Sequence, residues 1–211
     1  MMLHGVSLVL LLFVFLCCSC NQKNELLIIK KRLEKIHSID DSNRDKLQFL
    51  FSNKEKYSDE YFSKKITQVE KKDIKNFLYV EKIVRKYGWI GVDSIGIRAN
   101  EAIFLVVQHC PDGLSKRTDL NYFLNELKES IDRKQTNKKF YPYLYDRLKM
   151  QEGKKQLFGT QFITDDNGGA SLYPIENEKN LNDRRMEYGL SPIESYVKKM
   201  FNLQYVYKDS L

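Results

Sequence analysis

The sequence has few of the residues that build loops, cross-links and zinc sites. Of its 211 residues only 10 are Gly, 4 are Pro and 4 are Cys. This composition, with 42% hydrophobic and 30% charged residues, excludes a disordered chain, a fibrous protein and a polytopic membrane protein. The length suits one domain, or two small ones, and is sufficient for a hydrophobic core.

The cysteines are unevenly placed, because Cys17, Cys18 and Cys20 lie near the N-terminus and Cys110 stands alone. They follow an uncharged apolar run over residues 6–16. That run is shorter than the roughly 20 residues that a membrane-spanning helix needs. An apolar run of this length, followed by small residues, is typical of a secretory signal peptide.

The segment Leu16-Cys17-Cys18-Ser19-Cys20 resembles a bacterial lipoprotein signal, in which cleavage precedes a Cys that then carries lipid. The resemblance implies a signal peptide over residues 1–19, lipidation of Cys20 and a protein anchored in the cell envelope, periplasmic or surface-facing. The alternative is an uncleaved anchor or an unlipidated product, since the first five residues lack Lys and Arg. Only Cys110 then remains as a thiol, which excludes an internal disulfide and a Cys-rich zinc site. We expect no metal and no cofactor.

Basic charge is concentrated close to the expected anchor. Residues 20–86 hold 17 Lys and Arg against 11 Asp and Glu, whereas residues 87–211 hold 18 against 17. Basic side chains near an anionic membrane are favourable by about 1 kcal/mol each, so the membrane is one expected partner. The alternative is a solvated helix surface with no partner. We expect no nucleic-acid binding, because the chain is expected to be exported and carries no nucleic-acid motif.

The apolar spacing predicts a mainly α protein: a single helical domain with one small β-hairpin in its C-terminal third. We expect a basic, partly helical segment over residues 20–61, with a break at residues 40–44, followed by the helical domain over residues 62–211. The expected helices cover residues 62–86, 96–110, 120–131 and 140–152, with two short helices after the hairpin. The hairpin is expected at about residues 156–175, around the turn residues 165–169.

Polar side chains fall on one side of the apolar helix expected at residues 96–110. Arg98, Glu101, Gln108, His109 and Asp112 lie within an arc of roughly 100° on a helical projection. Such a stripe is either a water-facing edge or the wall of a pocket. In a pocket, His109 is the candidate general base and Glu101 or Asp112 the residue that orients it.

The sequence contains no Gly-x-Ser-x-Gly elbow, His-Glu-x-x-His motif, Gly-rich phosphate loop or nucleotide fingerprint. The best-defined hydrolase and NTPase classes are therefore disfavoured. Cys110 is not expected to pair with His109 as a catalytic dyad, because adjacent helical residues point about 100° apart. Cys110 is expected to pack as a small hydrophobic residue.

Three motifs occur in order: Tyr87-Gly88-Trp89, Gln108-His109-Cys110-Pro111-Asp112 and Phe158-Gly159-Thr160-Gln161. Together they resemble an uncharacterised bacterial domain family with Gly-Trp-Pro, Gln-His-Ala-Asp and Tyr-Gly-Thr-Gln signatures, over about residues 80–197. This chain departs at Ile90, at Cys110-Pro111 and at Phe158. The resemblance implies a shared fold and a shared site, without naming a reaction.

We therefore expect the helical domain to bind a small ligand or a protein partner. The pocket would be floored by the helix over residues 98–112 and flanked by the strand over residues 158–161. The expected ligand-binding residues are Arg98, Gln108, Trp89, Arg147, Thr160 and Gln161, although Trp89 also suits a core position.

Two alternatives remain open. One is an envelope hydrolase with His109 as general base and Arg147 or Gln161 stabilising negative charge. The other is a purely structural spacer that holds a partner near the membrane.

Overall fold

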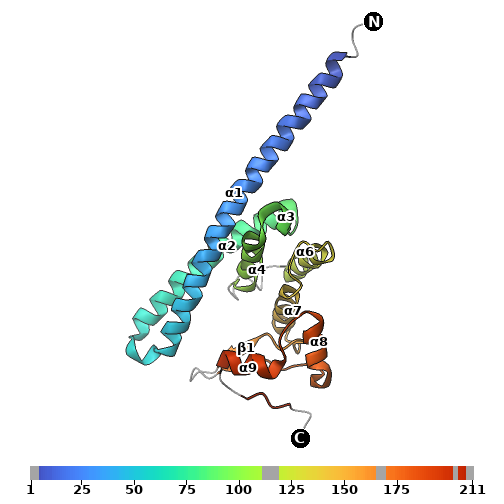
Figure 1. Cartoon of the computed structure of the whole chain (residues 1–211). Helices are drawn as coiled ribbons and strands as arrows, with labels where there is room; N and C mark the ends of the chain where they lie inside the picture. Colours follow the sequence, from blue (N-terminus) through green and yellow to red (C-terminus); the bar gives the residue numbers. More distant parts are fainter. Residues whose placement is uncertain (1–4, 111–118, 165–169, 202–203, 208–211) are drawn as a thin grey trace.

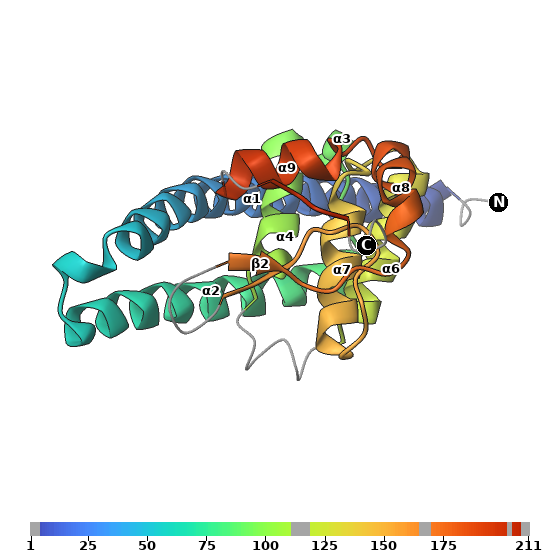
Figure 2. The ribbon, with the colours of Figure 1, turned by 90° about the horizontal axis from the view of Figure 1, so that it is seen from below.

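The computed structural model describes residues 5–110, 119–164, 170–201 and 204–207. A long helix, α1 (Gly5–Ser52), runs into the short 3-10 turn η1 (Lys54–Lys56) and then into α2 (Asp59–Tyr87). The two helices form a hairpin whose tip extends beyond the other helices (Figures 1 and 2). Among the described helices, none is long and apolar enough to cross a membrane.

The remaining elements gather beside this hairpin (Figure 1). They are α3 (Val92–Ile95), α4 (Ile97–Gln108), α6 (Leu120–Asp132), α7 (Phe140–Gln151), β1 (Phe162–Thr164), β2 (Ala170–Leu172), η2 (Glu178–Asn180), α8 (Leu181–Glu187) and α9 (Ile193–Phe201). β1 and β2 pair antiparallel, with Ile163 opposite Ser171. The predicted fold class, mainly α with one small hairpin, is confirmed.

Local sequence signals set the ends of these helices. The Ser58 side chain accepts a hydrogen bond from the backbone N–H of Tyr61 and caps α2, and Asp119 caps α6 in the same way through Tyr122. Gly88 ends α2 with a φ of 70°, a conformation that favours glycine. The predicted helices over residues 62–86, 120–131 and 140–152 are therefore confirmed to within a few residues.

The core is built around α4, the most apolar helix after the N-terminal run. It contacts α1, α2, α3 and α7. Its fully buried residues Ala99, Ala102, Ile103 and Val107 pack with buried side chains of the surrounding helices. A smaller second core packs the segment after β2 against α8 and α9. It consists of Ile175, Leu181, Ile193 and Val197.

The predicted break at residues 40–44 is wrong, because α1 continues through them without interruption. Asp40 and Arg44 are four residues apart, and their side chains pair at 3.1 Å across one helical turn. Upstream, Ile29, Leu33 and Ile36 are buried in the main core. Residues 20–52 of the basic segment therefore lie in the single helix α1, which shares the main core with the helices after it.

The predicted hairpin is confirmed, but its strands are shorter than residues 156–164 and 170–175. Gln156 makes a single parallel bridge to Ile175 instead of continuing the ladder. Its buried side-chain amide donates to the carbonyls of Gln161 and Tyr173 and accepts from the Gln161 N–H. These bonds replace ladder bonds, so residues 156–161 form a folded loop rather than a strand.

Leu33→Ala is expected to lower the free energy of unfolding by about 2–5 kcal/mol, because Leu33 is 0% exposed and its loss leaves a cavity. Leu27→Ala is the matched control, since Leu27 lies on the same helix and is 48% exposed. It is expected to change stability by about 0.5 kcal/mol or less. Chemical denaturation measures both, and equal effects would show that α1 is not part of the core.

Candidate functional site

The polar stripe of α4 faces α1. Arg98 donates from Nη2 to the Ser38 hydroxyl at 3.0 Å. The His37 ring lies between two carboxylates, with Nε2 3.3 Å from Glu101 and Nδ1 3.0 Å from Asp41. Arg98 and Glu101 of the stripe therefore contact polar residues of α1 while their side chains remain open to water.

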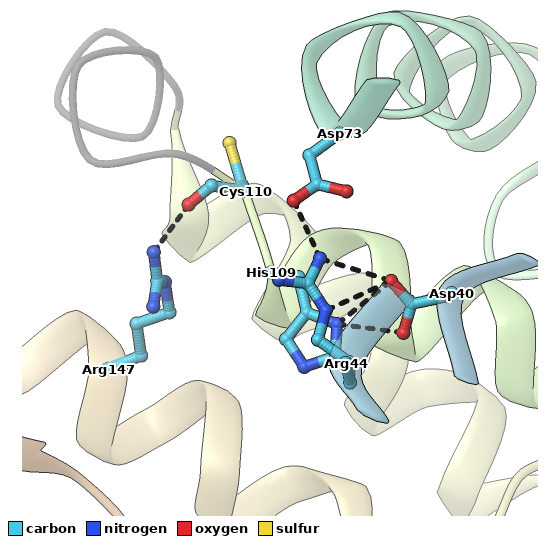
Figure 3. A network of polar contacts seen from close by, with 6 residues as sticks. All are labelled: Asp40, Arg44, Asp73, His109, Cys110 and Arg147. Atoms are coloured by element: carbon cyan, nitrogen blue, oxygen red, sulfur yellow. Dashed lines mark hydrogen bonds and ion pairs between the residues drawn. The ribbon is translucent and has the colours of Figure 1, made fainter. Parts of the chain in front are cut away.

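His109, which caps the C-terminal end of α4, joins a network that links α1, α2 and α4 (Figure 3). Its Nδ1 lies 3.0 Å from Oδ2 of Asp40, whose side chain is 6% exposed. Arg44 donates from Nη2 to Oδ1 of Asp40 at 3.1 Å and to Oδ2 of Asp73 at 2.6 Å. One carboxylate of α1 thus holds the imidazole, and one guanidinium connects that carboxylate to α2.

The pKa values of the two carboxylates in this network, Asp40 and Asp73, shift in opposite directions. Burial raises the pKa of Asp40, but the hydrogen bond from His109 and the charges of His109 and Arg44 outweigh it, so the net pKa is lowered. Burial also raises the pKa of Asp73, and there it outweighs the hydrogen bond and charge of Arg44. The network therefore favours the ionised form of Asp40.

A carboxylate at Nδ1 fixes the orientation of the His109 ring. With the proton placed on Nδ1 toward Asp40, as this hydrogen bond implies, Nε2 of the neutral ring carries the lone pair. The His109 side chain is 27% exposed, so it is accessible while being held in place. This arrangement suits a group that accepts a proton or a hydrogen bond from a ligand.

His109 lines a pocket of about 530 Å³ between α4, α7 and the C-terminal elements. Its walls carry the rings of Phe104, Phe140, Tyr143, Phe162 and Tyr196. Its polar groups are Glu101, Gln108, His109, Asn137, Lys139 and Thr160. Aromatic walls with a few convergent polar groups are typical of small-molecule sites of this size.

The Gln108 side chain adds a second polar feature to this pocket. Its Oε1 is buried and makes no hydrogen bond within the part of the chain that the structure describes. A buried acceptor without a partner is uncommon in folded proteins and costs free energy until a donor reaches it. A ligand with an N–H or O–H group would supply that donor.

The opposite wall of the pocket is organised by another buried carboxylate, Asp146 of α7. Its Oδ1 accepts from the N–H groups of Leu157 and Phe158, and its Oδ2 accepts from the N–H and hydroxyl of Thr160. Burial raises the pKa of Asp146, although these donors oppose the shift. Arg185 reinforces the loop by donating to the carbonyls of Phe158 and Ser191. Thr160 therefore reaches the pocket from a fixed loop.

The structure brings together only part of the predicted site. Glu101, Gln108, His109 and Thr160 line one pocket, whereas Asp112 lies outside the described residues. The remaining candidates have other surroundings. Trp89 is 1% exposed in the main core, Arg98 contacts α1, Arg147 donates to the Cys110 carbonyl, and Gln161 donates to the Tyr143 carbonyl.

Sequence reasoning missed Asp40, Arg44 and Asp73. A signal for Asp40 was present, because the spacing that begins at Ile29, Leu33 and Ile36 reaches Asp40 next and ends at the buried Leu50. A polar residue at a regular core position marks either a structural network or a site. The same signal marks Asp73, which falls between Val69 and Phe77 in the apolar spacing of α2 and is buried with Phe77. Over the described residues, no three or more His, Cys, Asp or Glu side chains gather where they could hold a metal.

Comparison with known proteins identifies the chain at the family level. Residues 31–208 match a protein family of unknown function, DUF6624. The chain belongs to this family. No curated protein and no solved structure matches the chain. The predicted membership of an uncharacterised family is confirmed, and the DUF6624 match begins early enough to include Asp40 and Arg44 of α1.

Asp40→Asn is expected to remove stability that depends on pH. The folded-state pKa of Asp40 lies below its ordinary value of 3.8, so ionised Asp40 stabilises the fold above pH 3.8. That contribution is lost as the pH falls from 3.8 through the folded-state pKa. The difference in unfolding free energy between wild type and Asp40→Asn should therefore narrow below pH 3.8. A difference that stays constant or widens there would contradict the pairing.

Proposed function

We propose that this DUF6624 protein is a lipid-anchored protein of the cell envelope whose helical domain binds a small molecule in the pocket beside His109. The observation that carries the binding part is the pocket of about 530 Å³, with aromatic walls and an imidazole fixed by the buried Asp40. A ring-walled pocket with hydrogen-bonding groups on one edge fits a ligand with a flat or apolar body and polar substituents.

The proposed anchor rests on the sequence around Cys20. An uncharged apolar run and small residues precede it, and a polar stretch follows it. Cys20 falls within α1, and a later turn of the same helix carries Asp40, which contacts His109 of the pocket. Intact-mass measurement of the native protein tests this part. A lipid-modified Cys20 at the N-terminus is expected, and a free Cys20 thiol would contradict it.

A second candidate function is hydrolysis in the same pocket, with His109 as general base. The 3.0 Å contact from Nδ1 to Asp40 favours it, because a carboxylate there orients the ring and stabilises the imidazolium that forms when Nε2 takes a proton. In this candidate a water molecule is the nucleophile: Nε2 accepts its proton as its oxygen attacks the substrate, and the imidazolium then returns the proton to the leaving group. Lys139 would stand near the developing negative charge.

His109→Gln is expected to abolish ligand stabilisation of the protein. In a thermal-shift screen of cell-wall sugars and aromatic metabolites, at least one compound should raise the Tm of the wild type but not that of His109→Gln. His37→Gln is the matched control, because His37 also contacts carboxylates of α1 and α4 but does not line the pocket.

The same compounds separate binding from hydrolysis. If a stabilising compound is also cleaved, the general-base candidate predicts that His109→Gln lowers kcat by about 10²–10⁴-fold. A compound that stabilises without being cleaved supports a binding protein. A shift that survives in His109→Gln, or is lost equally in His37→Gln, would contradict the pocket as the binding site.

A further inference from the structure

A second concave surface lies on the α1–α2 hairpin and shares no wall residue with the His109 pocket. It has a volume of about 830 Å³. Its wall contains five cationic side chains and no carboxylate: Arg32, Lys35, Lys46, Lys72 and Lys75. The α1–α2 hairpin brings residues that are far apart in the sequence into one groove, and all the charged side chains of its wall are positive.

These cations are available to a ligand. None of the five forms an ion pair with another residue in the described ranges, although Arg32 also stacks on the Tyr79 ring at 3.5 Å. The nearby carboxylates of Asp40 and Asp73 are already paired with Arg44. A concave surface of uncompensated positive charge attracts anions.

Asn43 adds a neutral polar side chain to the groove. It is only 6% exposed and lies in the wall of the groove, among the five cations. A nearly buried amide that opens onto a cationic groove can donate to an anion or accept from a hydroxyl group.

The cationic groove continues into an apolar hollow toward the tip of the hairpin. This hollow, of about 560 Å³, shares Asn43, Lys46 and Lys72 with the groove. Its wall also includes Asp45 and Lys65, whose Nζ lies 5.2 Å from the centre of the Tyr61 ring. Its apolar and aromatic members are Leu47, Phe49, Leu50, Tyr57, Tyr61 and Val69. Phe49 and Tyr61 are among the exposed large hydrophobic residues of the chain. One end of the combined surface is thus cationic, and the other end carries the apolar and aromatic side chains beside further lysines.

We propose that this surface binds one molecule of an anionic amphiphile, a lipid with a phosphate head group and acyl chains. The phosphate would lie among Lys46, Lys72 and Lys75, since lysine binds phosphate as a compact positive charge. The acyl chains would cover the ring of Tyr61 and its apolar neighbours, which removes their surface from water. This proposal is independent of the ligand of the His109 pocket.

Isothermal titration of the purified full chain with dihexanoylphosphatidylglycerol, below its micelle-forming concentration, tests the proposal. Saturable binding of one lipid per chain is expected. Lys72→Glu with Lys75→Glu should weaken it about tenfold or more, because like charges then face the phosphate. Tyr61→Ala should weaken lipid binding but leave binding of inorganic phosphate unchanged. This difference separates the head-group site from the acyl-chain site.

The matched control is Lys64→Glu with Lys71→Glu, which makes the same change in net charge on the same helix outside both walls. It should leave lipid binding within about twofold of wild type. An equal loss of lipid binding in the two double variants would show that overall charge causes the effect, and it would overturn the proposed site. Binding to phosphatidylglycerol vesicles without binding of the monomeric lipid would show that the α1–α2 hairpin binds a membrane surface. That result would also overturn the proposed single-lipid site.

Discussion

The structure depends on one buried charge, the carboxylate of Asp40. An ionised carboxylate inside a protein is costly unless it is paired and hydrogen-bonded. Asp40 meets this requirement with two partners, His109 of the α4 C-terminus and Arg44 of its own helix, and Arg44 passes the connection to Asp73 of α2. Loss of either partner would leave the buried Asp40 carboxylate without full compensation of its charge. These contacts therefore fix how α1 lies along α2 and α4.

A second buried carboxylate, Asp146, plays the corresponding part on the opposite side of the pocket. It accepts hydrogen bonds from backbone N–H groups of the loop before β1, including that of Thr160. Asp40 thus fixes His109 on one wall, and Asp146 fixes Thr160 on the other. Polar side chains held by buried partners lose little further conformational freedom when a ligand binds, which favours affinity. The pocket is therefore pre-organised by charges that do not themselves line it.

Periodicity in the sequence was sufficient for the helices that have one apolar face. α2 and α6 follow this pattern: Ser58 and Gly88 mark the two ends of α2, and Asp119 marks the start of α6. It failed at residues 40–44, where polar residues continue a helix whose inward face is not apolar. It also overestimated the strands of the hairpin, because nothing in the sequence shows that the Gln156 side chain replaces backbone bonds.

The candidate site was predictable only in the part that one helix carries. Glu101, Gln108 and His109 fall together because α4 fixes their relative directions, and their shared pocket follows from that. Arg147 and Gln161 point to backbone carbonyls, and only the tertiary packing decides this. Asp40 lies 69 residues before His109, so local spacing could not bring the two together.

The most direct test of the account is a double-mutant cycle between Asp40 and His109. The free energies of unfolding of wild type, Asp40→Asn, His109→Gln and the double variant give the coupling of the pair. The account predicts a coupling of about 1–3 kcal/mol at neutral pH, since the two side chains form one direct, partly buried contact. Effects that add within about 0.5 kcal/mol would contradict it, because they would show that Asp40 does not hold His109 in place.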